Sequence, residues 1–245
     1  MSLALIFALL GSIGAMAGAA LLLAFPDTLR TRLLPCLLAY ATGTLLGAAF
    51  LGMMPKALSM ATPLAVTGTV LAGMVGFFIL EKLILWRHCH DQDCESHGHA
   101  GASLILIGDA FHNFVDGIVI AAAFLTSPTL GVATALAVIA HEIPQELGDF
   151  AILLHNGLSK ARAFGNNLLS SLATLPGVFA GWYWLADMRQ AIPFVLAISA
   201  ASFIYIAVSD LVPGLHRQSS ARASLRQVLL LGAGIGTIAL FRFSH

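Results

Sequence analysis

The sequence predicts an all-α integral membrane protein with eight transmembrane helices. Three observations lead to this fold class: 58% of the 245 residues are hydrophobic, only 10% are charged, and apolar windows of helical length recur along the chain. Soluble domains have about a quarter of their residues charged, and a helix needs roughly 20 mostly apolar residues to cross a bilayer. A net charge of zero and three cysteines also speak against a nucleic-acid-binding protein and a disulfide scaffold.

Eight windows of the sequence have the length and composition of a membrane-spanning helix. In chain order they are Ser2–Phe25, Leu33–Met54, Ala61–Trp86, Ser103–Leu125, Thr129–His155, Ala163–Leu185, Ala191–Ser209 and Ala223–Phe243. The first window is too long for a cleaved signal peptide and lacks its basic start. No long linker or low-complexity run separates the windows, so residues 1–245 are expected to form one transmembrane domain.

The distribution of basic residues predicts the orientation of these helices. Nine of the twelve lie in the loops after the first, third, fifth and seventh windows, and three lie on the other side. The nine are Arg30, Arg32, Lys82, Arg87, Lys160, Arg162, Arg217, Arg222 and Arg226. Because cytoplasmic loops carry the excess of lysine and arginine, both termini are predicted to lie outside.

Small residues spaced four apart inside the windows predict close helix packing. Gly14 and Gly18, and likewise Gly43 and Gly47, would lie on one helix face. Such faces let helix backbones approach each other in lipid. We expect packing within one chain to use them, and a homodimer through such a face stays an alternative.

The fourth and fifth windows carry an unusual set of polar side chains. Between Ser103 and His155 there is no lysine or arginine, but there are five acids and three histidines: Asp109, Asp116, Glu142, Glu146, Asp149, His112, His141 and His155. Each charge at the membrane centre costs roughly 2.5–3.5 kcal/mol. Because the other windows offer almost no basic partner, protons or a bound metal cation must compensate these acids.

Helical spacing collects these residues into two stripes. One stripe holds Asp109, His112, Asn113 and Asp116, and the other holds Glu142, Gln145, Glu146 and Asp149, both at i, i+3, i+4 and i+7. His141 lies next to the second stripe. The very short loop 126–128 makes the two helices antiparallel neighbours, so the stripes are expected to meet between the fourth and fifth helices.

The donor set of these stripes predicts the class of ion. Imidazole, carboxylate and amide oxygen suit zinc, iron(II), manganese, cobalt or nickel, whereas the lack of thiolate disfavours copper(I). A single intramembrane acid is often structural, but the grouping of His112, Asn113, Asp116, His141 and Glu142 favours a metal site. Asn166 and Asn167 are expected to cap the sixth helix.

Four strings of the sequence resemble the ZIP (Zrt/Irt-like) metal transporters. They are HNFVDG (His112–Gly117), HEIPQELGDFAILLHNG (His141–Gly157), LEKLILWRH (Leu80–His88) and FIYIAVSDLVP (Phe203–Pro213). The second is most similar to the branch whose fifth helix carries HExPHExGD. The resemblance covers roughly residues 40–215. It implies eight helices, both termini outside, and a divalent cation, zinc or a related ion, moving toward the cytoplasm.

The resemblance also implies roles for individual residues. His112 and Asp116 would ligate a primary ion, and Gln145 holds a primary-site ligand position. Asn113, Asp116 and Glu142 would serve an adjacent second ion, and His141 and Glu146 belong to the same polar track. Gln145 departs from the histidine usual in this branch, and Ala48 and Gly52 replace an acid and a histidine of the second helix.

The predicted cytoplasmic loop at about residues 87–101 is rich in metal-binding residue types. It contains His88, Cys89, His90, Cys94, His97 and His99. A reducing cytoplasm would keep the thiols free, so this loop is a candidate zinc-capturing or metal-sensing site. The alternative is a solvated polar loop.

These observations predict a transporter, not an enzyme, in a multi-pass arrangement within the lipid bilayer. The expected cargo is Zn²⁺, with Fe²⁺, Mn²⁺, Co²⁺ or Cd²⁺ as related ions. The resemblance suggests an elevator-like alternating-access motion, and the expected location is the cell (plasma) membrane, as a prokaryotic inner-membrane protein. One alternative is a proton channel or proton-driven carrier. A less favoured alternative is an intramembrane metalloprotease, because Gln145 replaces the second histidine of HExxH and Pro144 should interrupt that helix.

Overall fold

The computed structural model describes the backbone of residues 1–89, 97–216 and 220–243, and the side chains of 1–83, 105–154, 156–216 and 220–241. Every regular element in these ranges is helical. The elements are α1 (Ser2–Ala24), α2 (Asp27–Gly47), η1 (Ala48–Met53), α3 (Met54–Leu58), α4 (Pro63–Cys89), α5 (His97–Thr126), α6 (Pro128–His155), α7 (Lys160–Ser171), α8 (Thr174–Asp187), η2 (Arg189–Ala191), α9 (Ile192–Ile206), η3 (Ala207–Leu211), α10 (Val212–His216) and α11 (Ala221–Phe243). The all-α prediction is confirmed for these residues.

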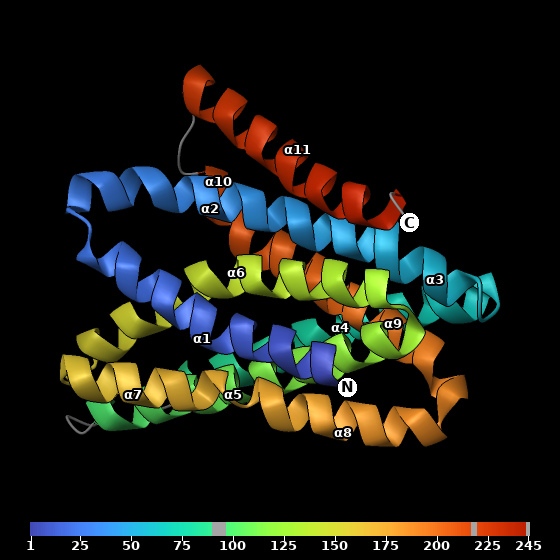
Figure 1. Cartoon of the computed structure of the whole chain (residues 1–245). Helices are drawn as coiled ribbons and strands as arrows, with labels where there is room; N and C mark the ends of the chain where they lie inside the picture. Colours follow the sequence, from blue (N-terminus) through green and yellow to red (C-terminus); the bar gives the residue numbers. More distant parts are fainter. Residues whose placement is uncertain (90–96, 217–219, 244–245) are drawn as a thin grey trace.

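The helices run back and forth along one bundle direction (Figure 1). The two ends of the chain lie at the same end of the bundle, on the right in Figure 1. α6 lies in the middle of the bundle, and α1, α2, α5 and α11 all contact it. The central helix is therefore one of the two that carry the predicted polar stripes.

Seven helical segments in the described ranges are long and apolar enough to cross a membrane. They are Ser2–Ala24, Asp27–Leu58, Pro63–Leu83, Ile105–Thr126, Lys160–Asp187, Arg189–His216 and Ala221–Phe241. The remaining predicted window, the fifth (Thr129–His155), corresponds to α6, which has 28 residues but is not among the seven. Its second half carries His141, Glu142, Gln145, Glu146 and Asp149, and these polar side chains lower its hydropathy.

Two long helices contain wider π-helical turns that the sequence analysis did not predict. η1 joins α2 to α3 just before Pro55, and η3 joins α9 to α10 just before Pro213. A proline lacks an N–H donor, and its ring clashes with the carbonyl four residues earlier. In both helices that carbonyl lies within the π turn, so the widened turn accommodates the proline.

The sixth predicted window, Ala163–Leu185, lies within the membrane-length segment Lys160–Asp187, which a two-residue break divides into α7 and α8. The break falls at Leu172 and Ala173, and Pro176 has no N–H to donate to the Leu172 carbonyl. The break lets α7 and α8 approach α5 separately, and both contact it. By contrast, α6 runs through Pro144 as one helix, so the interruption expected at Pro144 is wrong.

Two helix pairs pack with their backbones in contact. A Cβ atom on Gly177 of α8 would lie 2.1 Å from the Phe114 carbonyl oxygen of α5. A Cβ atom on Gly43 of α2 would lie 2.1 Å from the Leu231 carbonyl oxygen of α11. Only glycine permits this separation, so these contacts fix α8 beside α5 and α11 beside α2.

The predicted loop 87–101 is shorter than expected, because α4 continues through Cys89 and α5 begins at His97. An established helix gains one backbone hydrogen bond for each residue added, which favours such extension. The candidate loop ligands His88, Cys89, His90, Cys94, His97 and His99 lie outside the residues whose side chains the structure describes.

Candidate metal centre

A tight connection sets α5 and α6 side by side. α5 ends at Thr126 and α6 begins at Pro128, where the Leu130 N–H donates to the Ser127 hydroxyl at 3.2 Å. Serine at the N-cap and proline in the first turn are favourable helix-start residues. His112 lies fifteen residues before Ser127 and His141 fourteen after it, so both reach the same level of the bundle.

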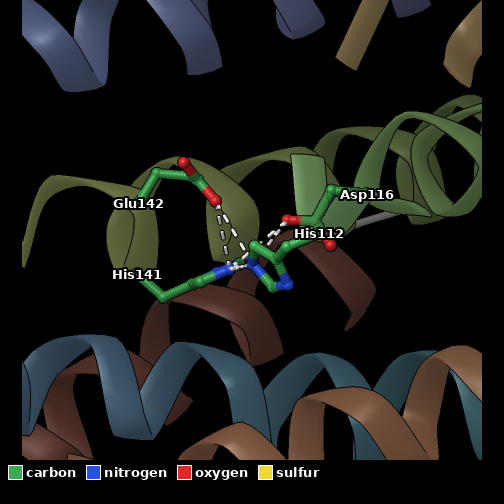
Figure 2. Close-up of side chains that lie close together, drawn as sticks. All are labelled: His112, Asp116, His141 and Glu142. Atoms are coloured by element: carbon green, nitrogen blue, oxygen red, sulfur yellow. Dashed lines mark hydrogen bonds and ion pairs between the residues drawn. The ribbon is translucent and has the colours of Figure 1, made fainter. Parts of the chain in front are cut away.

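Four side chains converge at that level (Figure 2). They are His112 and Asp116 from α5 and His141 and Glu142 from α6, and one ligand atom from each lies within 4.8 Å of all the others. The two histidine Nε2 atoms are 3.2 Å apart. From His112 Nε2, the Glu142 Oε1 atom is 3.4 Å away and the Asp116 Oδ2 atom 3.7 Å away. From His141 Nε2, the corresponding distances are 3.6 and 3.3 Å.

These separations fit the edges of a coordination tetrahedron. Ligands at 2.0–2.1 Å from a tetrahedral zinc ion lie about 3.3 Å from one another. Five of the six distances among the four atoms fall between 3.2 and 3.7 Å. The donor atoms are therefore already arranged at the spacing that a tetrahedral ion requires.

A hydrogen bond holds the imidazole of His141 in an orientation suited to metal binding. Its Nδ1 atom lies 3.0 Å from the Ala137 carbonyl oxygen, one turn earlier on α6. Because a carbonyl can only accept, Nδ1 carries the proton and Nε2 presents its lone pair to the cluster. The Phe203 ring of α9 packs edge-on against the same imidazole, with 5.8 Å between ring centroids.

The electrostatics of the cluster also favour a cation. Asp116 and Glu142 are each 1% exposed, and within the described residues none of their four carboxylate oxygens has a hydrogen-bond partner. Buried ionised groups without partners are strongly unfavourable. A divalent cation bound by neutral imidazoles would balance the two carboxylates.

Asp109 is the centre of a second, hydrogen-bonded network beside this cluster. Its Oδ1 atom accepts from Asn113 Nδ2 at 3.0 Å and from Gln145 Nε2 at 3.5 Å. Its Oδ2 atom accepts from the Ser170 hydroxyl of α7 at 2.5 Å. Both carboxylate oxygens thus accept hydrogen bonds, and through them Asp109 links α5, α6 and α7.

Asn113 and Gln145 belong to this network, whereas Glu146 is bonded to Asn167, and none of the three is part of the four-residue cluster. The oxygen of the Asn113 amide accepts from the Thr174 hydroxyl at 3.0 Å, so that amide is engaged at both ends. Glu146, fully buried, accepts at Oε2 from Asn167 Nδ2 at 2.5 Å. The structure therefore gathers four of the seven predicted membrane-site residues and places Asn113, Gln145 and Glu146 next to them.

α7 and α8 contribute polar side chains to the site that were not predicted from the sequence. Asn167 was expected to cap a helix, but Ser159 occupies the cap position and Asn167 lies fully buried in the third turn of α7. A signal was present in the sequence. Asn167, Ser170, Ser171 and Thr174 follow the same i, i+3, i+4 and i+7 spacing as the two recognised stripes.

The arrangement is suited to binding an ion and lacks the constellation of an HExxH metalloprotease. That motif needs a histidine four residues after the first, where this chain has Gln145. The Gln145 amide donates toward Asp109 instead. Two observations spoke against a protease: Pro144, expected to interrupt the helix, and Gln145 in place of the second histidine. Because the helix is continuous through Pro144, only the second observation still holds.

A bundle of apolar helices around a buried imidazole and carboxylate cluster defines a multi-pass membrane protein with an internal metal-type site. The family model described as ZIP zinc transporter matches residues 87–242. This chain belongs to the ZIP zinc transporter family, so the resemblance is confirmed. Members of that family are transporters, which agrees with the prediction that the chain is not an enzyme.

Several curated relatives of this chain are named zinc transporters. Zinc transporter ZIP13 of Pongo abelii is 33% identical over 222 residues, which cover 84% of this chain and 66% of the relative. Zinc transporter zipt-7.2 of Caenorhabditis elegans is 31% identical and covers 83% of this chain and 57% of the relative. Zinc transporter ZIP4 of Mus musculus is 44% identical over 112 residues, which cover 46% of this chain and 17% of the relative. The chain therefore spans about two thirds or less of these relatives' length.

Proposed function

We propose that this protein transports a divalent transition-metal ion across a membrane, with Zn²⁺ as the main cargo. The observation that carries this proposal is the tetrahedral spacing of His112, Asp116, His141 and Glu142 inside an apolar bundle. The zinc transporter names of the relatives support the choice of zinc. Fe²⁺, Mn²⁺, Co²⁺ and Cd²⁺ are further candidates, since imidazole and carboxylate ligands accept them as well.

In this proposal the four-residue cluster holds the cargo in transit. The oxygens of the two carboxylates replace some of the water ligands of the ion and balance its charge. The imidazoles favour a transition metal. Asn113 and Gln145 act through Asp109, which fixes their amides beside the cargo. A second ion close to the first, which the resemblance implies, would need an amide to turn toward it.

Orientation and direction follow from the charge distribution and topology. We propose that the chain crosses the membrane eight times and that α6 is the most polar of these crossings. Both termini would lie outside, and the loops that hold nine of the twelve lysines and arginines would lie in the cytoplasm. The cargo would move inward, into the cytoplasm. The proposed location is the plasma membrane of a prokaryote, and residues 1–245 would act as one domain. The likeness of HEIPQELGD (His141–Asp149) to HExPHExGD favours that branch of the family.

The packing suggests which parts would move together during alternating access. The backbone contact at Gly177 joins α8 to α5, and Asp109 ties α7 and α6 to the same helix. We propose an elevator-like motion in which these four helices carry the site as a unit. α4 and α11 expose most of their apolar windows, which the lipid bilayer or a second copy of the chain would cover.

Metal uptake into proteoliposomes tests the proposal. The wild type should accumulate Zn²⁺, and parallel assays with Fe²⁺, Mn²⁺ and Cd²⁺ would rank the cargo. His112→Ala and Asp116→Ala should abolish uptake, whereas the exposed control variants His216→Ala and Asp187→Ala should not. Proton flux without metal, or cleavage of peptides by the same preparation, would point to one of the rival functions.

The histidine and cysteine segment between α4 and α5 is proposed as a separate zinc-capturing site on the cytoplasmic side. It would comprise His88, Cys89, His90, Cys94, His97 and His99. Deleting Cys89–His99, which removes five of these six residues, should lower the uptake rate or remove its feedback by metal. Unchanged uptake and unchanged feedback would mean that the segment is only a polar loop.

A further inference from the structure

Among the described residues, seven of the eight buried side-chain oxygens without a hydrogen-bond partner fall into two groups. The first group consists of the four carboxylate oxygens of Asp116 and Glu142, which belong to the cargo site. The second consists of Glu146 Oε1, Asn167 Oδ1 and Ser171 Oγ. The one further side-chain atom of this kind, Thr134 Oγ1, lies at the opposite end of α6. The cargo site as proposed above leaves the second group unexplained.

The three residues of the second group lie against one another. The Asn167 amide donates to both the backbone carbonyl and the carboxylate of Glu146, at 3.1 and 2.5 Å. Ser171 lies one turn beyond Asn167 on α7, so it shares that helix face. All three side chains are 0% exposed. We refer to Glu146, Asn167 and Ser171 as the oxygen cluster.

α1 closes the oxygen cluster on its remaining side. The Ser12 hydroxyl donates to the Ser171 carbonyl oxygen at 2.9 Å, and the Met16 sulfur lies 3.6 Å from Asn167 Nδ2. The cluster is thus enclosed by α1, α6 and α7. No lysine or arginine is present on these helices near this level to neutralise Glu146.

The chemistry of the three free atoms differs from that of the cargo site. One carboxylate oxygen, one amide oxygen and one hydroxyl form an oxygen-only donor set, which suits a hard divalent cation that keeps part of its water shell. The absence of imidazole makes this set a weaker ligand for zinc. Glu146 is one turn from Glu142 on the same face of α6, toward the His155 end.

We propose that the oxygen cluster is a second cation site, which receives the divalent cargo after it leaves the histidine-containing cluster. The identity of the cargo in this inference rests on the proposed transport function. The site itself rests on the three buried oxygens that have no hydrogen-bond partner. A weaker, partly hydrated site one turn further along α6 would let the ion exchange its imidazole ligands for water before release.

Binding of Mn²⁺ to the purified full-length protein tests this site, because Mn²⁺ accepts oxygen ligands and its free form is counted by electron paramagnetic resonance. The His112→Ala/His141→Ala variant removes both imidazoles and should still bind one Mn²⁺. Adding Glu146→Gln, which keeps the side-chain shape, should weaken that remaining binding by roughly tenfold or more. Ser171→Ala in the same background should weaken it in the same direction.

Thr134→Ala is the matched control, since it removes another fully buried hydroxyl without a partner at a distant point of α6. It should leave the Mn²⁺ affinity unchanged. If the double-histidine variant binds no Mn²⁺, or if Glu146→Gln and Ser171→Ala leave its binding intact, the oxygen cluster is not a cation site. Loss of Zn²⁺ uptake in His112→Ala would still support the transport function, so the two proposals fail separately. If Glu146→Gln does not fold, Ser171→Ala decides the outcome.

Discussion

The Nε2 atoms of His112 and His141 lie 3.2 Å apart, although they belong to different helices and are 29 residues apart in the sequence. The short Thr126–Pro128 connection brings them to one level, and the Ala137 carbonyl sets the tautomer of His141. Two imidazoles and two carboxylates therefore face a common point.

Removing His141 should abolish high-affinity metal binding. His141→Ala takes away one of four ligands, so its effect on Zn²⁺ affinity should exceed the roughly 10–100-fold loss typical of changes in the outer shell of a metal site. Isothermal titration with Zn²⁺ in detergent provides the measurement. The exposed His216→Ala variant serves as control, and an unchanged affinity in His141→Ala would remove this residue from the site.

Asp109 should act on the metal only through the residues that it orients. Asp109→Ala leaves the Asn113 and Gln145 amides without their shared acceptor, and Zn²⁺ affinity should fall by about 10–100-fold. Asp109→Asn should recover part of the loss, because an amide oxygen still accepts hydrogen bonds. Equal effects of the two variants would indicate that the Asp109 charge itself contacts the ion.

Metal should stabilise the folded protein. A ligand that binds only the folded state adds about 2.7 kcal/mol of stability when its concentration is one hundred times Kd. Zn²⁺ should therefore raise the thermal unfolding midpoint of the wild type, and a chelator should reverse the increase. Asp116→Ala should show no such response. A zinc-induced increase of equal size in that variant would place the binding elsewhere.

The contact between α5 and α8 should not tolerate a methyl group. Gly177→Ala places a Cβ atom 2.1 Å from the Phe114 carbonyl oxygen, so the helices must separate. Overpacking of this kind costs about 1–3 kcal/mol, and the unfolding midpoint should fall together with uptake. Gly165→Ala in α7 is the control, because no atom lies within 4 Å of its added Cβ. That variant should gain up to about 1 kcal/mol from helix propensity.

Labelling of single cysteines should reveal the orientation of the bundle. In a chain without Cys36, Cys89 and Cys94, the exposed positions Ser59→Cys and Ala161→Cys lie at opposite ends of the bundle. A membrane-impermeant maleimide added to intact cells should label Ser59→Cys and leave Ala161→Cys unlabelled. The reverse pattern would place the basic loops outside and contradict inward transport.

The sequence alone predicted a helical membrane protein and a set of seven site residues that includes the four that converge. Helices satisfy their own backbone hydrogen bonds in lipid, and the short connection 126–128 places the stripe with His112 and Asp116 beside His141 and the stripe that begins at Glu142. These relationships are local or nearly local, so they can be inferred from spacing. The same reasoning placed the sixth span correctly but did not predict the break at Leu172 and Ala173, because hydropathy carries no information on the missing N–H of Pro176.

Only the tertiary structure decided what surrounds those four residues. Asp109, Glu146 and Asn167 looked like an extra acid, a further ligand and a helix cap, yet they form a network between α5, α6 and α7. That network depends on which helix face packs against which, and this is set by close backbone contacts such as Gly177 against Phe114 and by the break between α7 and α8. Packing of this kind joins residues about 60 positions apart. The spacing of Asn167, Ser170, Ser171 and Thr174 marks a polar helix face, but it does not say which helices pack against that face.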